Sequence, residues 1–394
     1  MFFVLALLAF FAIAMPDAML GVAWPFMRVT LDQPLAAMTV VLPFGVAATL
    51  VSASGWTWAA ARLTLGRLLA GSVALSAVAL LSCAIAPAYW VIVASAVLFG
   101  LSGGAIDAAL NAHAARHFGP RQINLMHAAY GVGAASSPLV VTVVVSTGTS
   151  WRWAYLVVMV VQVALAVMFA VSSRRWDQAV RTEDQAAQTE DQAAQTDDEP
   201  GPASPIPGRA RWRPPPRAVA GLVVVAVESG LESVVGLWAF VFLLGGVTLS
   251  PAVAGVVISG YWVALVVGRV ILGAVAERAG TWPVLATATI AAVVAAALLL
   301  SRQPVPSAAG VVLLGFTLAP IYPLLVLTTA ERTSARSVDR LVGFQAAADT
   351  VGSLVCASLA GVIMAADLGG FTYYVLTLAL LTTAGIWALK PGKR

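Results

Sequence analysis

Charged residues are scarce in this sequence, and so are the residue types that build metal sites and disulfides. Only 10% of the 394 residues are charged, while 60% are hydrophobic and the mean hydropathy is +0.91. This composition excludes a soluble globular chain and predicts an integral membrane protein. The two cysteines, Cys83 and Cys356, lie far apart in apolar segments and are expected to be core residues. Neither cysteine has a second thiol or a histidine at the spacing of metal ligands, so we expect no metal site and no cofactor.

Long apolar stretches recur along the whole chain, each close to the roughly 20 residues that a helix needs to cross a bilayer. The predicted fold class is therefore all-α integral membrane, with twelve transmembrane helices. The predicted helices cover residues 2–26, 35–57, 65–86, 89–115, 122–147, 151–172, 218–244, 252–276, 282–300, 306–329, 339–364 and 370–389.

A polar segment separates the sixth and seventh predicted helices. It carries the heptapeptide TEDQAAQ at 182–188 and again at 189–195, and then becomes rich in Pro, Ser, Gly and Arg. Such a segment buries little apolar surface, so we expect a flexible cytoplasmic linker, with a docking segment as the alternative. The predicted organisation is a six-helix half at 1–172, the linker at 173–217 and a pseudo-symmetric six-helix half at 218–394, with a site between the halves.

The basic residues predict the orientation of the chain. If both termini are cytoplasmic, 18 of the 22 Lys and Arg residues fall on the cytoplasmic side and three fall outside, and the last, Arg269, lies within a helix. The positive-inside rule therefore favours a multi-pass protein with both termini in the cytoplasm. No basic residue precedes the first apolar run, so we expect the first helix to be retained. The high ratio of arginine to lysine and the high alanine content favour a GC-rich bacterium, so the expected location is the bacterial inner membrane. The formal net charge of +4 is explained by these loops, so no nucleic-acid partner is expected.

Five carboxylates lie inside the predicted helices, namely Asp17, Asp107, Glu228, Glu232 and Asp349. A charge at the centre of a spanning helix costs about 3 kcal/mol, so structure alone does not account for them. They predict a polar pathway or binding cavity. Because burial favours the protonated form of a carboxylate, an acid in an apolar cavity can bind and release a proton as its exposure changes.

Helical spacing groups several of these polar residues. Residues three or four apart share a face of a helix. This places together Asp107 and Asn111, Glu228 and Glu232, and Asn124 and His127, although an interhelical hydrogen bond or ion pair would explain each pair equally.

Other polar and aromatic residues have more than one interpretation. Glu228 and Arg269 lie at similar depths, so we expect a neutralising ion pair with a structural or gating role. Asp349 is predicted either to contact the solute or to serve helix packing, and both interpretations stay open. Gln345, one turn earlier, would share the same surface. Trp238 is the best candidate for an aromatic ring against the apolar face of a sugar.

A loop motif follows the eighth predicted helix. Residues 273–280 read GAVAERAG and follow Gly268 and Arg269, whereas the corresponding stretch at 61–67 lacks the acid. The motif resembles the short cytoplasmic loop of major facilitator transporters. The resemblance implies that Glu277 and Arg278 join helix ends on the cytoplasmic side. The alternative is that they are ordinary charged loop residues without this role.

A narrower resemblance rests on stretches in five predicted helices. They are DAMLGVAWP at 17–25, DAALN at 107–111, NLMHAAYGVGA at 124–134, Glu232 six residues before Trp238, and GFTLAPIYP at 315–323. These stretches resemble the fucose:proton symporter family, and the resemblance covers all twelve helices but not the linker.

The resemblance implies roles for individual residues. Asp17 would face the sugar cavity and Asp107 would couple protons, with Glu232 as a further coupling acid. His127 and Tyr130 stand where that family has two amides near the sugar. Asn124, in the same predicted helix, and Asn111, in the helix before it, are further candidates for contact with the solute. Imidazole and phenol in place of amides imply a different hydroxyl pattern, so fucose itself is not expected.

We therefore expect a monomeric, proton-coupled symporter that moves a small polar solute, with a carbohydrate as the first expectation, by alternating access. The alternatives are a proton-coupled exporter of drugs or metabolites, a sodium-coupled sugar carrier, and a receptor that binds without transport. An enzyme is not expected, because no nucleophile with a base lies at membrane depth.

Overall fold

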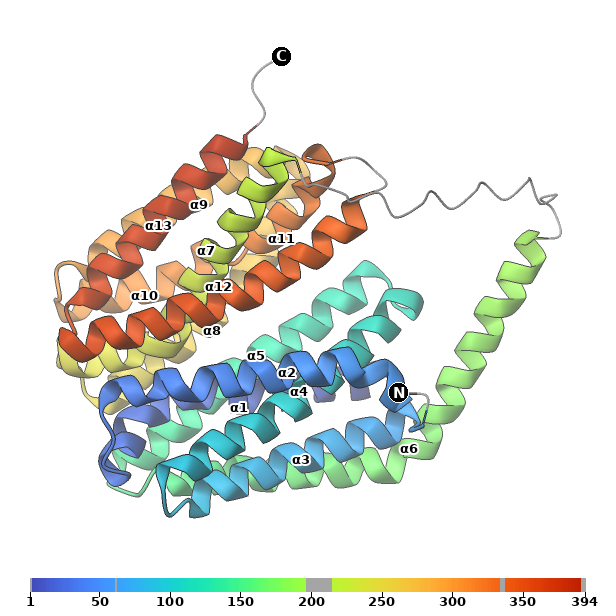
Figure 1. The fold of residues 1–394 in the computed structure, drawn as a ribbon, viewed down its shortest axis with the longest axis horizontal. Helices are drawn as coiled ribbons and strands as arrows, with labels where there is room; N and C mark the ends of the chain where they lie inside the picture. Colours follow the sequence, from blue (N-terminus) through green and yellow to red (C-terminus); the bar gives the residue numbers. More distant parts are fainter. Residues whose placement is uncertain (1, 61, 196–214, 334–336, 391–394) are drawn as a thin grey trace.

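The computed structural model describes residues 2–60, 62–195, 215–333 and 337–390. Within them, twelve helices are long and apolar enough to cross a membrane, which confirms the predicted number (Figure 1). In the N-terminal half these are α1 (Phe2–Thr30), α2 (Met38–Ala60), preceded by the short turn η1 (Leu35–Ala37), α3 (Leu65–Ile85), α4 (Tyr89–His117), α5 (Pro120–Ser146) and α6 (Arg152–Gln195).

The C-terminal half repeats this pattern. It contains α7 (Pro216–Val241), which continues into the π-helical turn η2 (Phe242–Gly246), then α8 (Pro251–Ala279), α9 (Thr281–Leu299), α10 (Pro304–Leu318), α11 (Ile321–Leu327), the turn η3 (Thr328–Glu331), α12 (Val338–Ala366) and α13 (Gly370–Leu389). The predicted all-α fold of two six-helix halves is thus confirmed, and Figure 1 shows one half above the other.

Two elements differ from simple spans. The tenth span is interrupted between Leu318 and Ile321, so α10 and α11 are separate helices. Pro320 and Pro323 account for this interruption, because proline lacks the amide hydrogen and clashes with the preceding turn. By contrast, α6 runs through the segment expected to be flexible, up to Gln195. Its two heptapeptides are rich in Ala, Gln and Glu, which are strong helix formers. The rest of the predicted linker up to residue 214 lies outside the described residues.

Glycines bring helices within each half into close contact. A Cβ atom at Gly100 or Gly104 of α4 would collide with the backbone carbonyls of Gly45 and Thr49 of α2. In the same way, a Cβ atom at Gly352 of α12 would collide with a backbone carbonyl of α7. Small residues allow such close approach between membrane helices.

The two halves touch at the helix ends that lie away from the α6–α7 connection. Gly21 of α1 packs against the Leu237 carbonyl of α7, and the rings of Phe26 and Phe240 lie 6.3 Å apart. Further contacts toward this side join Thr142 with Gly255 and Thr39 with Gly361. The molecule is therefore held closed at the end opposite the connection between the halves.

Candidate functional site

A cavity of about 500 Å³ lies mainly within the N-terminal half. Its walls come from α1, α2, α4 and α5, with single residues from α3 and α6, and Arg269 of α8 reaches it from the other half. Its ionisable groups include Asp17, Asp107, His127 and Arg269. Much of the remaining lining is apolar, with Phe10, Ile13, Leu20, Val41, Leu42, Val46, Ile92 and Phe99.

Both aspartates of the cavity have a hydrogen-bond donor. The Tyr130 hydroxyl of α5 donates to Asp17 Oδ2 of α1 at 3.0 Å. The helices approach closely enough for this because Gly133 packs against a backbone carbonyl of α1. On α4, the Asn111 amide donates to Asp107 Oδ1 at 2.8 Å, the pair that the four-residue spacing predicted. Asp17 and Asp107 also interact electrostatically, so the two acids belong to one site.

His127 lies on the same wall of the cavity. Its ring packs edge-on against Phe10, with 5.3 Å between the ring centroids, and it interacts electrostatically with Arg269. The Asn124 side chain, predicted to share this face, lies outside the described residues. The His127 ring is therefore held in place by Phe10 and can form hydrogen bonds with a molecule in the cavity.

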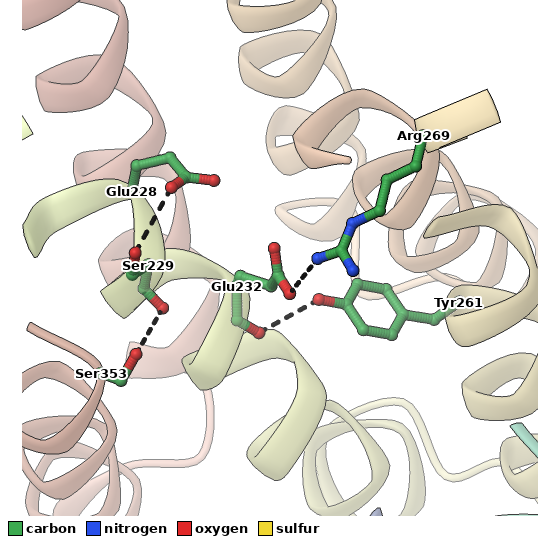
Figure 2. A network of polar contacts seen from close by, with 6 residues as sticks. All are labelled: Glu228, Ser229, Glu232, Tyr261, Arg269 and Ser353. Carbon is green, nitrogen blue, oxygen red and sulfur yellow. Dashed lines mark hydrogen bonds and ion pairs between the residues drawn. The ribbon is translucent and has the colours of Figure 1, made fainter. Parts of the chain in front are cut away.

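A second group of acids lies in the C-terminal half. Arg269 Nη2 donates to Glu232 Oε1 at 3.4 Å, and the Tyr261 hydroxyl donates to the Glu232 backbone carbonyl at 3.1 Å (Figure 2). The expected pairing of Arg269 with Glu228 is therefore corrected to Glu232. The two glutamates are one turn apart on α7, so the depth in the membrane estimated from the sequence could not decide which of them pairs with Arg269. In Figure 2 a dashed line joins one carboxylate oxygen of Glu228 to Ser229, and none joins Glu228 to the arginine.

Three residues proposed from sequence to contact the solute lie elsewhere. Trp238 is fully buried and its indole nitrogen donates to the Ala357 carbonyl at 2.8 Å. Gln345 is also buried and accepts a hydrogen bond from Thr329 at 2.9 Å. Asp349 is partly exposed on α12 and interacts electrostatically with Glu232. In the conformation described, none of the three lines the cavity.

Comparison with known proteins identifies the family. A family profile described as Major Facilitator Superfamily matches residues 6–250, which is more than half of the chain. The chain belongs to the major facilitator superfamily. Family and fold together indicate a membrane transporter rather than an enzyme. The sequence matches no curated protein.

Solved major facilitator transporters share the fold over nearly the whole chain. The nucleoside transporter NupG, in a mutant form, superposes with a TM-score of 0.69 at 13% identity, covering 98% of both chains. A bacterial homologue of the human lysosomal transporter Spinster, in an inward-facing and occupied conformation, gives 0.70 at 12% identity, covering 98% of this chain and 96% of that one. The peptide transporter POT in complex with sulfate gives 0.70 at 12%, covering 98% and 93%. At such identities the likeness extends to the fold and no further.

The loop motif typical of the superfamily lies away from the cavity. Glu277 and Arg278 are both exposed in the last turn of α8. The described residues contain no group of three or more His, Cys, Asp and Glu side chains placed to hold a metal ion.

Several residues that line the cavity were not predicted from the sequence. Thr49, Phe99 and Tyr155 line the cavity but carry no charge that marks them in a span. The spacing of Gly100 and Gly104 was the one available signal, because small residues four apart favour close helix packing. This packing brings α4, with Asp107, against α2.

Proposed function

We propose that the protein is a proton-coupled symporter that moves a small polar solute, with a sugar as the first candidate, across the bacterial inner membrane. One observation carries the proposal. The cavity holds two carboxyl groups, Asp17 and Asp107, each with its own hydrogen-bond donor, and it is completed by Arg269 from the opposite half. A group shared between the halves can respond when they move relative to each other.

The aspartates suit proton coupling because a carboxyl group on a cavity wall changes its exposure with each conformation. Asp107 is the first candidate for the coupling proton, with Asp17 beside it. The Asn111 amide can donate to Asp107 when that group is ionised, and the amide carbonyl can accept from it when it is protonated. The side chains therefore accommodate both protonation states without rearranging the helix.

The size and chemistry of the cavity suit a small polar solute. Its volume of about 500 Å³ falls in the range of small-molecule sites, roughly 300–1,000 Å³. Carboxylates, imidazole, phenol and guanidinium can bind hydroxyl groups, while Phe10 and Phe99 offer rings for an apolar face. In the proposed site, Phe10 and Phe99 supply the aromatic ring against the solute that was expected of Trp238.

Alternating access accounts for the packing of the halves. They are closed at the end away from the α6–α7 connection, and the positive-inside rule places that connection in the cytoplasm. On that orientation the closed end lies on the outer side of the membrane, and both termini are cytoplasmic. Each twelve-helix chain carries its own cavity, so we propose that the monomer is the transporting unit.

Uptake into proteoliposomes tests the proposal. The purified protein would be offered tritiated glucose, galactose, fucose and uridine under an imposed pH gradient, and separately under a sodium gradient. We expect uptake of a sugar that is driven by the pH gradient and abolished when the gradient is collapsed. Uptake driven only by sodium, or no response of any panel solute to either gradient, would contradict the proposal.

The apolar wall of the cavity favours export of hydrophobic solutes as a second candidate. Five aliphatic residues of α1 and α2 line the cavity, namely Ile13, Leu20, Val41, Leu42 and Val46. An exporter would expel a lipophilic cation such as ethidium in exchange for protons. The same liposomes, loaded with ethidium and given the opposite pH gradient, discriminate between the two functions.

A further inference from the structure

Glu228 of α7 is a buried acid to which the proposed function assigns no role. Its side chain is 0% exposed, and Oε1 has no hydrogen-bond partner within the part of the chain that the structure describes. The other oxygen receives only a long contact of 3.5 Å from the Ser229 hydroxyl. The surrounding helices leave little freedom, since Gly230 packs against Cys356 and Gly352 against the Ala226 carbonyl.

Arg269 interacts with Glu228 electrostatically but forms its ion pair with Glu232. Arg269 donates to Glu232, one turn further along α7, and Figure 2 draws no contact between the arginine and Glu228. A carboxylate that is buried without a paired cation or full hydrogen bonding is strongly disfavoured. Glu228 is therefore held as the neutral acid, with its proton bound, in this conformation.

Glu228 is nevertheless connected to groups that solvent can reach. The charged and titratable groups that interact with it electrostatically come from α7, α8, α11 and α12, and they are Glu232, Arg269, Tyr261, Tyr322 and Asp349. Glu232 and Asp349 are partly exposed, and Arg269 lines the cavity. Glu232 and Asp349 are therefore the partly exposed carboxyl groups available to exchange a proton with Glu228 when the helices move.

We propose that Glu228 is a second proton carrier, located in the C-terminal half, so that the transporter moves two protons with each solute molecule. This inference rests on the proposed proton-coupled symport. In the conformation described, Glu228 carries its proton while Glu232 is ionised against Arg269. When the halves rearrange, Arg269 moves from Glu232 toward Glu228, so that Glu232 takes up the proton that Glu228 gives up and the ionised Glu228 gains the cation that it lacks in this conformation. The proton then leaves through the partly exposed carboxyl groups, and no other reactant is required.

The geometry explains why a carboxyl group, rather than an amide, occupies this position. A glutamine side chain here would be equally neutral and would offer two donors to the same space, so packing alone does not require an acid. An acid adds the ability to exchange a proton. When it is ionised it also repels Glu232 and Asp349, which ties its protonation to theirs.

The number of protons moved per solute tests the inference. Proteoliposomes would be prepared with the wild type, Glu228→Gln and Asp107→Asn, using the tritiated panel sugar with the highest uptake. At a fixed solute gradient, the membrane potential and pH gradient at which net flux stops give the ratio. We expect a ratio of two for the wild type and one for Glu228→Gln.

Each other outcome is also decisive. Wild-type uptake that ignores the pH gradient overturns both the inference and the proposed function. A wild-type ratio of one, or a folded Glu228→Gln protein that keeps a ratio of two, overturns the inference alone. Loss of net uptake in a folded variant that retains solute exchange supports it, whereas loss of exchange as well overturns it, because exchange requires no net proton movement.

A second variant guards against misfolding. Glu228→Met has a similar volume and removes the unpartnered oxygen, so it is expected to fold at least as well as the wild type. It must lower the ratio in the same way as Glu228→Gln, because both variants lack the titratable group. A ratio of two in this variant would overturn the inference.

Discussion

The guanidinium of Arg269 lies 3.4 Å from the Glu232 carboxylate, yet the same side chain lines the cavity formed mainly by the other half of the molecule. The pair is partly exposed, with 37% of the arginine and 22% of the glutamate side chain accessible. A single long contact leaves most of the five arginine donors unused. Arg269 can therefore exchange partners as the halves move, without leaving its helix.

Substitution of Arg269 tests the importance of this pair. Arg269→Gln leaves Glu232 as an unpaired acid, so we expect thermal stability and uptake both to fall. The double variant Arg269→Gln/Glu232→Gln has neither charge, and it should recover part of the stability but not the coupling. Melting temperature in detergent and uptake in liposomes measure the two effects. Additive losses in the double variant would show that the two side chains are not coupled.

Removal of the coupling acid should separate exchange from driven transport. Asp107→Asn keeps the shape of the side chain and can still bond to Asn111 at the 2.8 Å spacing. We expect uptake driven by the pH gradient to fall at least tenfold, while exchange of solute between equal concentrations continues. The wild type should transport faster as the pH on the loading side falls, because protonation precedes transport. Unchanged pH-driven uptake in the variant would refute the role of Asp107.

The hydrogen bond between Tyr130 and Asp17 should contribute to solute affinity. Tyr130→Phe removes the donor to a carboxylate, an interaction worth about 1.5–3 kcal/mol, and we expect the apparent affinity to weaken about tenfold or more. Tyr89→Phe is the matched control. It removes the bond to the Ala37 carbonyl outside the cavity, so it should lower stability and leave affinity unchanged. Equal effects of both variants on affinity would contradict a direct role for Tyr130.

Trp238 offers a test of packing against solute contact. Trp238→Phe loses the hydrogen bond to the Ala357 carbonyl within a closed core, so we expect a lower melting temperature with little change in apparent affinity. Uptake as a function of solute concentration, together with thermal unfolding, measures both. A weaker affinity at unchanged stability would restore the solute-contact role predicted from sequence.

Gly21 should control the closed side of the molecule. Gly21→Ala places a methyl group against the Leu237 carbonyl, and overpacking of this kind costs about 1–3 kcal/mol. We expect the conformational equilibrium to shift about tenfold toward the form open on the side away from the α6–α7 connection. Spin labels at the outer ends of α1 and α7 would report the change as a longer distance. Gly71→Ala, where the added methyl meets open space, is the control and should leave the distance unchanged.

Much of the fold could be predicted because each span carries its own signal. The helices need about 20 apolar residues each, and the boundaries of α3, α4, α9 and α13 lie within about two residues of the prediction. The interruption at Pro320 was predictable for the same reason, since proline acts locally. The extension of α6 was missed because the low apolar content of 182–195 was weighted above its helix propensity.

The site was predictable in its residues but not in its connections. Charges inside apolar stretches identify Asp17, Asp107, Glu232 and Arg269, because their cost in a membrane is a property of the residue itself. The pair of Asp107 and Asn111 follows from helical spacing within one element. The pair of Asp17 and Tyr130 joins two helices that are more than 100 residues apart in the chain, so no local pattern could reveal it.

The sequence by itself therefore determined the membrane environment, the number of spans and the identity of the costly polar residues, because these depend on local hydrophobicity. The tertiary structure alone decided which acids face the cavity and which are buried beside it. Glu228 and Glu232 are one helical turn apart and chemically alike, yet packing places one against Arg269 and leaves the other enclosed at 0% exposure. That difference arises from contacts between helices, which a pattern along one helix does not contain.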